Sequence, residues 1–411
     1  MYPLASKRPA SRTTSGFTLI EIMVGMVIGV LGLIIMMQVF TLSESQKRTT
    51  TGGGDALSSG AIALFGLQRD IRQAGYGVND PNILGCNVLL RAGVTLNAIA
   101  PVTINHASIT GQDANTDTLL TVYSSSAGAP QGDGIASQPA SAGAATYPDV
   151  YQPNTPSAFG NGELIIATPQ NRATPCNLTL TAASPVPGTS YISVTAGTGL
   201  ANATQGLLFD LGLAPKIHAY AIRGGRLTQC DYMVNDCGNA ANNNDTTKWV
   251  PISNNIVSIK AQYGRDTMYG LNPTNTTMDG IVDWYDQVTP YGPASNPQYA
   301  QGTAQPAPPM NGGAAGPTYQ CAYARISAVR LAVVARNANF EKTAVTAIAP
   351  TWEGSVAHTP PNPPTAADST GWSANPIDLS ANASWQNYRY RVIQMVVPLR
   401  NLVWQGVPTG C

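Results

Sequence analysis

The residue types that most often carry catalysis are isolated from one another in this chain. The three histidines, His106, His218 and His358, do not form an H-E-x-x-H zinc motif. The sequence also contains no G-x-S-x-G elbow, no phosphate-binding loop and no dinucleotide-binding glycine pattern. His218 lies in the short run IHAYAI, where a lone histidine is typical of a structural role. The sequence therefore predicts no catalytic site and no cofactor.

Three carboxylates in one turn-rich stretch could supply oxygen ligands to a cation. Asp266, Asp279 and Asp283 lie within DTMYGLNPTNTTMDGIVDWYD, and Ca²⁺ takes roughly six to eight such ligands. The alternative is a turn in which Asp and Asn side chains cap their own backbone. We favour this second interpretation and predict no metal site.

The cysteines could form disulfides, because all of them follow the apolar N-terminal run and so fall in the part expected to meet an oxidising compartment. They occupy six positions, Cys86, Cys176, Cys230, Cys237, Cys321 and Cys411. The sequence alone does not choose among the possible pairings. Cys230–Cys237 is favoured locally, and Cys321–Cys411 and Cys86–Cys176 are further candidate pairs.

One more carboxylate stands out because of its surroundings. Glu21 is the only charge in residues 17–40, which are otherwise almost entirely apolar. A helix rises about 1.5 Å per residue, so this run is long enough to cross a bilayer core of roughly 30 Å. An acid within such a helix costs about 2.5 to 3.5 kcal/mol and usually marks a function. We therefore predict one transmembrane helix that contains a functional glutamate.

The flanks of the apolar run predict its orientation. Lys7, Arg8 and Arg12 precede it without any acid, whereas the charges that follow are nearly balanced. The positive-inside rule then puts the short N-terminus in the cytoplasm and the bulk of the chain across the membrane. A secretory signal is the alternative, but the run is too long for one and no Ala-x-Ala site follows it.

The segment GFTLIE, residues 16–21, resembles the class III signal of type IV pilins and type II secretion pseudopilins. The resemblance implies a leader over residues 1–16, which a prepilin peptidase removes by cleaving between Gly16 and Phe17 before it N-methylates Phe17. It also implies that Glu21 pairs with the positively charged N-terminus of a neighbouring subunit. A charge that needs such a partner would fix the register of helices in a filament.

Residues 41–76 are expected to form the amphipathic second half of this helix, with Gly52, Gly53 and Gly54 loosening or breaking it. Asp55 is then a plausible N-cap and Gly75 a plausible C-cap. Apolar residues recur at helical spacing at Leu57, Ala61, Leu64, Leu67, Ile71 and Ala74. This stripe predicts a helix face that packs on a sheet.

Residues 77–411 change to short β-branched and aromatic runs separated by Gly, Pro and Asn clusters. Seven runs are expected to be strands, at 118–123, 163–168, 190–195, 217–222, 255–264, 325–336 and 388–400. Residues 127–162, 290–317 and 350–376 are rich in Pro, Gly, Ala and Ser and are expected to be long loops. The prediction is an α+β, pilin-like fold: a long N-terminal helix on an antiparallel β domain with long insertions.

Segments such as LQRDIRQAGYG (67–77), VSIKAQYGRD (257–266) and YRYRVIQMVVPLRN (388–401) resemble, in order, parts of PilW-type minor pilins. This resemblance implies a low-abundance pilin that primes pilus assembly and sits at or near the tip. It implies as partners the prepilin peptidase, other minor pilins and the major pilin, a tip adhesin and the inner-membrane assembly platform. The net charge of zero and the absence of a basic patch predict no nucleic-acid partner.

Two alternatives stay open at this point. A minor pseudopilin of a type II secretion system shares the helix and sheet plan. A surface-binding adhesin would instead use the long loops to bind a host, a solid support or DNA.

Overall fold

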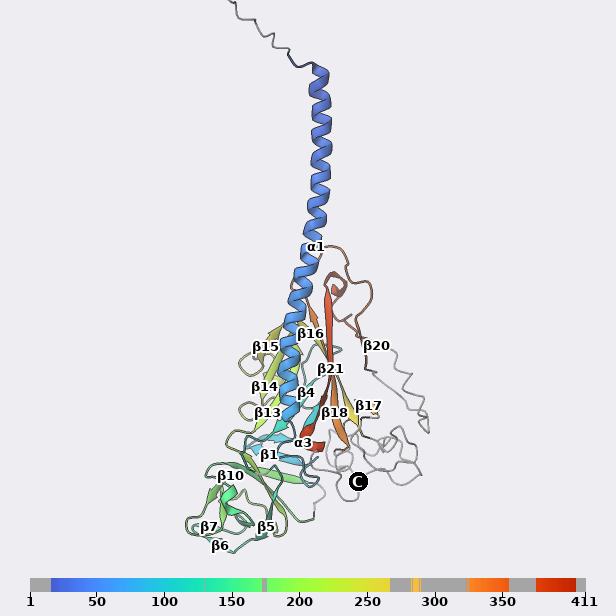
Figure 1. Ribbon diagram of the computed structural model, residues 1–411. Helices are drawn as coiled ribbons and strands as arrows, with labels where there is room; N and C mark the ends of the chain where they lie inside the picture. The colour runs from blue at the N-terminus through green and yellow to red at the C-terminus, as the bar shows by residue number, and fades with distance from the viewer. Residues whose placement is uncertain are drawn as a thin grey trace, which may run out of the picture. The chain divides into compact units, whose positions relative to one another are not determined.

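The computed structural model describes residues 16–128, 130–171, 176–266, 282, 284–287, 289, 323, 325–354 and 375–403 (Figure 1). The chain forms two compact units, residues 1–54 and 55–411. The helices and 3-10 turns are α1 Leu19–Gln73, η1 Pro156–Ala158, η2 Ala240–Asn242, η4 Trp385–Asn387 and α3 Arg400–Val403. The strands are given below with the sheets that they form.

Helix α1 runs without interruption through Gly52, Gly53 and Gly54, so the predicted break is wrong and Asp55 lies inside the helix rather than at an N-cap. A glycine costs only about 1 kcal/mol relative to alanine in a helix interior, and helical turns on both sides make the element cooperative. The helix ends as expected, because Gly75 adopts a φ of +87° and its N–H donates to the Val122 carbonyl at 2.9 Å.

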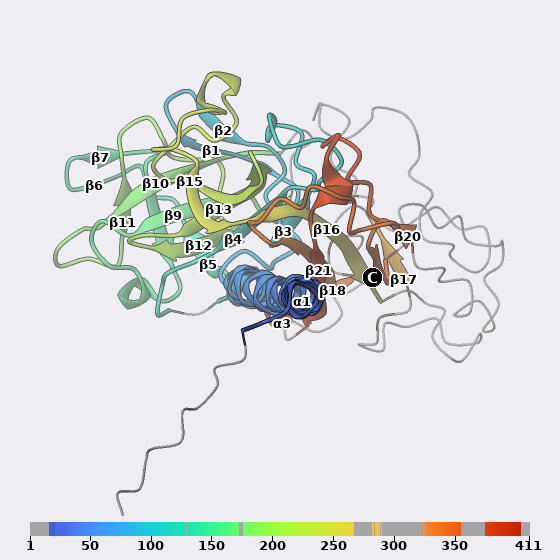
Figure 2. The same ribbon diagram turned by 90° about the horizontal axis from the view of Figure 1, so that it is seen from above.

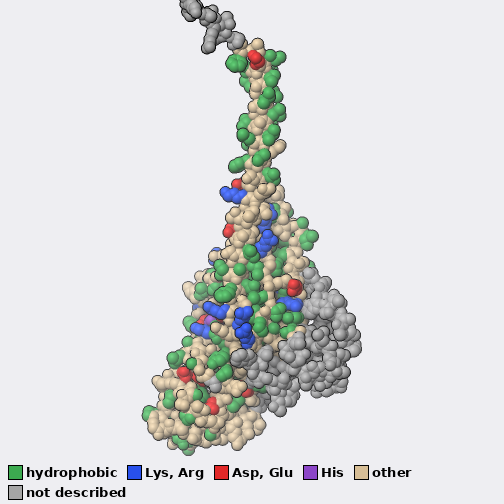
Figure 3. Space-filling model, viewed as in Figure 1, with side chains coloured by type: hydrophobic (Ala, Val, Ile, Leu, Met, Phe, Trp, Pro, Cys, Tyr) green, Lys and Arg blue, Asp and Glu red, His purple; other side chains and the backbone are tan. Residues whose placement is uncertain are grey.

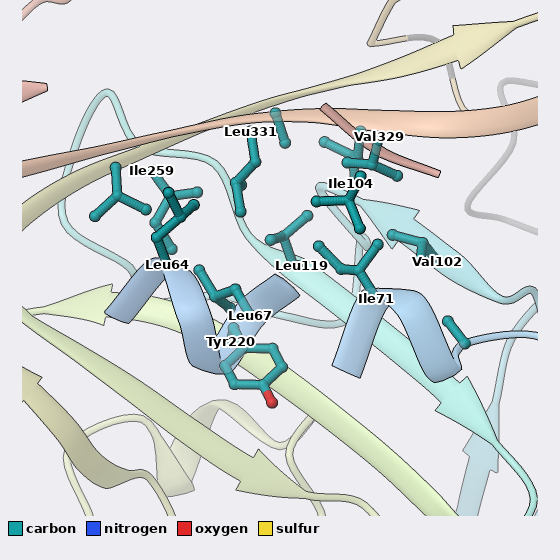
Figure 4. Packing of buried hydrophobic residues seen from close by; sticks show 14 of the residues in the cluster. Leu64, Leu67, Ile71, Val102, Ile104, Leu119, Tyr220, Ile259, Val329 and Leu331 are labelled. Carbon is teal, nitrogen blue, oxygen red and sulfur yellow. The ribbon is translucent and has the colours of Figure 1, made fainter. Parts of the chain in front are cut away.

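The second half of α1 buries one face in the main core of the second unit. Leu64, Leu67 and Ile71 point from the helix into this core, where they meet strand residues (Figure 4). The predicted stripe is wrong at its start, since Leu57 is 54% exposed and Ala61 also faces solvent. Ala56 and Ala63 take part in the core instead, because the buried face is rotated slightly around the helix from the one that the sequence indicated.

Two antiparallel sheets supply the other side of this core (Figure 2). The five-stranded sheet has the order β15-β14-β13-β4-β3, and the four-stranded sheet has the order β17-β16-β18-β21. Their strands are β3 Val102–Ile104, β4 Leu119–Tyr123, β13 Lys216–Arg223, β14 Arg226–Asp231, β15 Val250–Asn254, β16 Ile256–Arg265, β17 Trp284–Asp286, β18 Ile326–Arg336 and β21 Tyr390–Pro398. Strands far apart in sequence thus converge on one helix.

A third, eight-stranded sheet lies beyond the C-terminal end of α1 and has the order β11-β8-β5-β12-β9-β10-β1-β2 (Figure 1). Its strands are β1 Asn87–Arg91, β2 Val94–Leu96, β5 Asp133–Ser137, β8 Val150–Pro153, β9 Leu164–Thr168, β10 Asn177–Pro185, β11 Ile192–Val194 and β12 Leu207–Gly212. The expectation of antiparallel pairing is wrong at one place, because β1 pairs with β10 in parallel. The rest of this sheet is antiparallel.

The predicted loop at 127–162 is also wrong. This segment contains β5 and β8, and between them the small hairpin of β6 Ser141–Ala142 and β7 Ala145–Thr146. Its strands are short and interrupted by Gly and Pro, so the composition of the segment is typical of a loop and does not indicate strands. The predicted loop at 350–376 contains β19 Thr351–Trp352 paired with β20 Asn375–Pro376 at its ends, and the loop at 290–317 lies outside the described residues.

Two of the three candidate disulfides are present. Cys86–Cys176 and Cys230–Cys237 both lie in a second core, which also contains Trp249 and which connects the five-stranded and eight-stranded sheets. Cys321 and Cys411 lie outside the described residues.

Candidate functional site

Residues 16–18, which contain the predicted cleavage site, lie outside the helix and are exposed. Gly16, Phe17 and Thr18 precede the helix, and Phe17 is 85% exposed. Apart from Gly16 and its chain neighbours, no atom of the described residues lies within 4 Å of the position that a Cβ of Gly16 would take. The bond between Gly16 and Phe17 is thus accessible within the isolated subunit, as an extended substrate for a peptidase would need to be.

Glu21 interacts with the start of its own helix. Its Oε2 accepts hydrogen bonds from the Thr18 backbone N–H and from the Thr18 hydroxyl, both at 2.9 Å. The Glu21 N–H in turn donates to the Thr18 hydroxyl oxygen at 3.3 Å. This reciprocal arrangement is a capping box, which satisfies N–H groups that have no partner inside the helix.

The capping role of Glu21 was not predicted from the sequence, although the sequence contains a signal for it. The spacing Thr-x-x-Glu directly before an apolar run predicts a capping box. The bonds from Thr18 engage Oε2 of Glu21, so Oε1 keeps its capacity to accept a bond from outside the subunit.

The first unit presents an apolar surface on all sides. Every large apolar side chain from Leu19 to Leu42 is exposed, and hydrophobic atoms cover this half of α1 in Figure 3. Among the described residues, α1 is the one helix long and apolar enough to cross a membrane, although length and composition alone do not distinguish a span from a signal sequence. Such a surface in water would drive association, so the segment requires a bilayer or other apolar helices around it.

A second ionisable group on α1 is fully buried in the other unit. Asp70 is 0% exposed, and its Oδ2 accepts a 2.7 Å bond from His218 Nδ1 and a bond from the Tyr220 hydroxyl, both on β13. A carboxylate only accepts, so the His218 proton sits on Nδ1. Arg69 lies 3.4 Å from the other oxygen but is largely exposed.

This cluster joins the last turns of α1 to the five-stranded sheet. Burial raises the pKa of Asp70, but the hydrogen bonds from His218 and Tyr220 outweigh burial, so its pKa lies below the usual 3.8. Burial and the Asp70 charge both raise the pKa of Tyr220. Asp70 is therefore ionised and held by its neighbours, and no nucleophile accompanies it in the bonds described.

The other candidate site residues do not assemble into a site. Asp266 is buried, and its N–H donates to the carbonyl of Arg325 at 2.8 Å. Burial lowers the pKa of Arg325, and the charge of the nearby Asp266 opposes that shift. Asp279 and Asp283 lie outside the described residues, and no group of three potential metal ligands occurs within them.

His106 has the structural role expected for an isolated histidine. It is buried, its Nε2 lies 3.0 Å from the Asn97 carbonyl, and its Nδ1 accepts from the Ser108 N–H. Burial lowers the pKa of His106, so the ring is neutral. His358 lies outside the described residues.

Two family models match the chain, and together they decide its class. The Prokaryotic N-terminal methylation motif matches residues 11–37, which contain Gly16, Phe17 and Glu21. Type IV Pilus-assembly protein W matches residues 226–401, from β14 to α3. The matches support a PilW-type pilin with a class III signal. No curated protein and no solved structure matches it.

The matches divide this pilin in an informative way. The PilW match contains β16, β18 and β21, the strands of the four-stranded sheet that seat α1. The whole eight-stranded sheet, from Asn87 in β1 to Gly212 in β12, falls between the two matched regions. Membership of the type IV pilus assembly class implies pilins of the pilus and the prepilin peptidase as partners. The signal and the apolar helix are consistent with a single-pass protein of the inner membrane.

Proposed function

We propose that this pilin is a minor subunit that helps prime assembly of a type IV pilus, is incorporated at or near its tip, and has a structural rather than catalytic role. The observation that carries the proposal is Glu21, a carboxylate at the start of a helix whose apolar side chains are all exposed. Adhesion and twitching motility would depend on it through the pilus that it helps to build.

Cleavage after Gly16 would give Phe17 a charged α-amino group next to the capping box. The Thr18 N–H remains in the mature chain, so the bonds that hold Glu21 survive processing. Glu21 Oε1 can then accept from the amino group of a neighbouring subunit. Among apolar helices, a stagger that leaves this charge unpaired would cost about 3 to 5 kcal/mol, which selects one register.

The position near the tip is supported by the eight-stranded sheet. This sheet lies beyond the C-terminal end of α1 in the second unit (Figure 1). A wide module of this kind needs room that a subunit surrounded by others does not have. The free end of a filament offers that room.

The partners proposed for this subunit are the prepilin peptidase, the other minor pilins and the major pilin, a tip adhesin and the inner-membrane assembly platform. Before assembly its N-terminus would lie in the cytoplasm and its β-rich body in the periplasm. After assembly the body would be displayed at the cell surface.

The test is a deletion strain of the native host, scored for surface pili with and without the retraction motor. A priming subunit predicts few pili in the deletion strain and recovery when retraction is blocked. Complementation with Glu21→Ala should fail to restore piliation although the protein is processed, and Glu21→Asp should be intermediate. Glu44→Ala is the matched control, because Glu44 lies on the same helix and only pairs with Arg48 at 3.3 Å on the surface. Normal piliation with Glu21→Ala would overturn the proposal.

A second candidate function is surface binding by the module between the matched regions. The eight-stranded sheet has its own hydrophobic core around Tyr151, Phe159 and Leu208, so it is a structured element rather than a tolerated loop. Deleting it while keeping piliation would separate the two functions. Dependence of protein secretion rather than piliation on the chain would instead indicate a minor pseudopilin.

A further inference from the structure

Strand β21 forms one edge of the four-stranded sheet and pairs with β18 along its whole length. The N–H of Asn337 donates to the carbonyl of Arg389, and the N–H of Leu399 donates to the carbonyl of Ser327. Partners in an antiparallel ladder alternate between bonded and non-bonded pairs. The backbone groups of residues 391, 393, 395 and 397 therefore face β18, while those of Val392, Gln394 and Val396 face away from the sheet.

Those outward groups form an open hydrogen-bonding edge. Within the part of the chain that the structure describes, no residue bonds to the outward N–H or C=O groups of Val392, Gln394 or Val396. The faces of the strand, in contrast, are occupied. Ile393 and Met395 pack against the core that holds α1, and Tyr390 and Val392 pack against a smaller outer cluster around Trp352.

The edge lacks the usual protection against pairing with another chain. Edge strands are commonly blunted by proline, lysine or a bulge. The edge strand β15 of the five-stranded sheet contains Pro251 and has a bulge opposite Leu227 and Thr228. From residue 390 to residue 397, β21 has no proline, no lysine and no register shift.

Charge indicates what kind of segment fits this edge. Residues 388–403 contain three arginines and no acid. Arg389 pairs with Glu341 at 3.7 Å, but Arg391 and Arg400 are exposed and have no carboxylate partner among the described residues. Val396 is 45% exposed and adds an apolar contact on the edge.

We propose that β21 is a docking edge for an extended segment of a different pilin subunit, which adds a strand to this sheet. The segment would carry apolar side chains at alternate positions and carboxylates near its ends, opposite Arg391 and Arg400. Strand addition takes its affinity from backbone bonds and its specificity from alternate side chains. A second copy of β21 fits less well, because it would bring two all-positive segments together.

The proposal assumes the pilus assembly role, and a first measurement tests it independently of that role. Hydrogen exchange on the full chain in detergent should alternate along β21, with fast exchange at Val392, Gln394 and Val396 and slow exchange at Ile393, Met395 and Val397. Co-expression with the other pilins should slow exchange at the outward set. Outward amides already protected in the isolated chain would show that the chain covers its own edge and would overturn the proposal.

A pair of matched variants provides the second test. Val396→Lys places an edge lysine on β21, and Ile252→Lys does the same on β15, where Ile252 is 40% exposed. Val396→Lys should reduce co-purification of other pilins by about tenfold or more without lowering the melting temperature, whereas Ile252→Lys should not. Arg391→Glu should weaken recovery in the same way.

The docking edge and the assembly role can be refuted by different results. Normal recovery with Val396→Lys and Arg391→Glu, together with lost piliation for Glu21→Ala, would refute the docking edge and leave the assembly role standing. Concentration-dependent self-association through β21 would also refute it, because the occupant would then be a second copy.

Discussion

Asp70 provides the most direct test of how α1 is fixed to its sheets. Asp70→Ala removes a buried acceptor from two donors, His218 Nδ1 and the Tyr220 hydroxyl. Each buried donor left without a partner costs about 1 to 3 kcal/mol. The loss of the carboxylate should therefore lower the free energy of unfolding by about 2 to 6 kcal/mol. Urea titration of the full chain in detergent, followed by tryptophan fluorescence, measures this difference.

Arg69→Ala is the matched control for this experiment. Arg69 is next to Asp70 and within 3.4 Å of its Oδ1, but its side chain is 65% exposed. An exposed pair of this kind contributes about 1 kcal/mol or less. A double-mutant cycle of Asp70→Ala with Tyr220→Phe should also show coupling, because one hydrogen bond is lost only once. Equal effects of the two single alanine variants would refute the assignment of Asp70 as the anchor.

The same cluster predicts a pH dependence with a definite sign. The pKa of Asp70 is lower in the folded protein than its ordinary 3.8, so the folded state favours the ionised form. Its stabilising contribution is fully present above 3.8 and is lost as the pH falls through the folded-state pKa. The difference between wild type and Asp70→Ala should thus be constant at neutral pH and shrink below 3.8.

Three further outcomes are expected. Gly16→Leu should leave an unprocessed precursor, since a side chain would hinder the extended backbone at the cut; a mature N-terminus at Phe17 in mass spectrometry would contradict this. Because the pKa of His106 is lowered in the folded state, the unfolded state takes up the imidazole proton at a higher pH than the folded state does. The free energy of unfolding should therefore fall as the pH drops below 6.5, and His106→Asn should reduce this dependence on pH in acid titrations. The Cys86–Cys176 disulfide spans 90 residues, and its replacement by serines should lower the free energy of unfolding by about 4 to 5 kcal/mol in urea titrations. The Cys230–Cys237 disulfide spans 7 residues, and its replacement should cost about 2 kcal/mol. Equal losses would contradict the explanation by loop entropy.

The sequence predicted the elements whose signal is local and periodic. All seven predicted strands exist, and β18 and β21 were placed within two residues of their observed ends, because long apolar and alternating runs leave little choice. The α+β layout followed from these strands and the N-terminal helix. The capping box of Thr18 and Glu21 could also have been read from its spacing.

What the sequence did not reveal depends on contacts between distant segments. No local pattern marks the charged Asp70 for burial, yet His218 and Tyr220, far along the chain, make its burial possible. The parallel pairing of β1 with β10 likewise depends on a crossover that no local pattern marks. The strands within 127–162 are too short, and too rich in Gly and Pro, to rise above a loop composition.

Glu21 and Asp70, two of the carboxylates of α1, differ in their remaining capacity to bind a partner, and this difference separates the two functions of the helix. Both oxygens of Asp70 have cationic or hydrogen-bonding neighbours within the subunit, so this residue has no role left outside it. Among the described residues, Glu21 receives its bonds only from Thr18, and the large apolar side chains around it are exposed. Burial within apolar helices would therefore leave Glu21 short of a positive charge, while Asp70 would be unaffected. The demand for an external partner is thus confined to the end of the helix that carries the methylation motif.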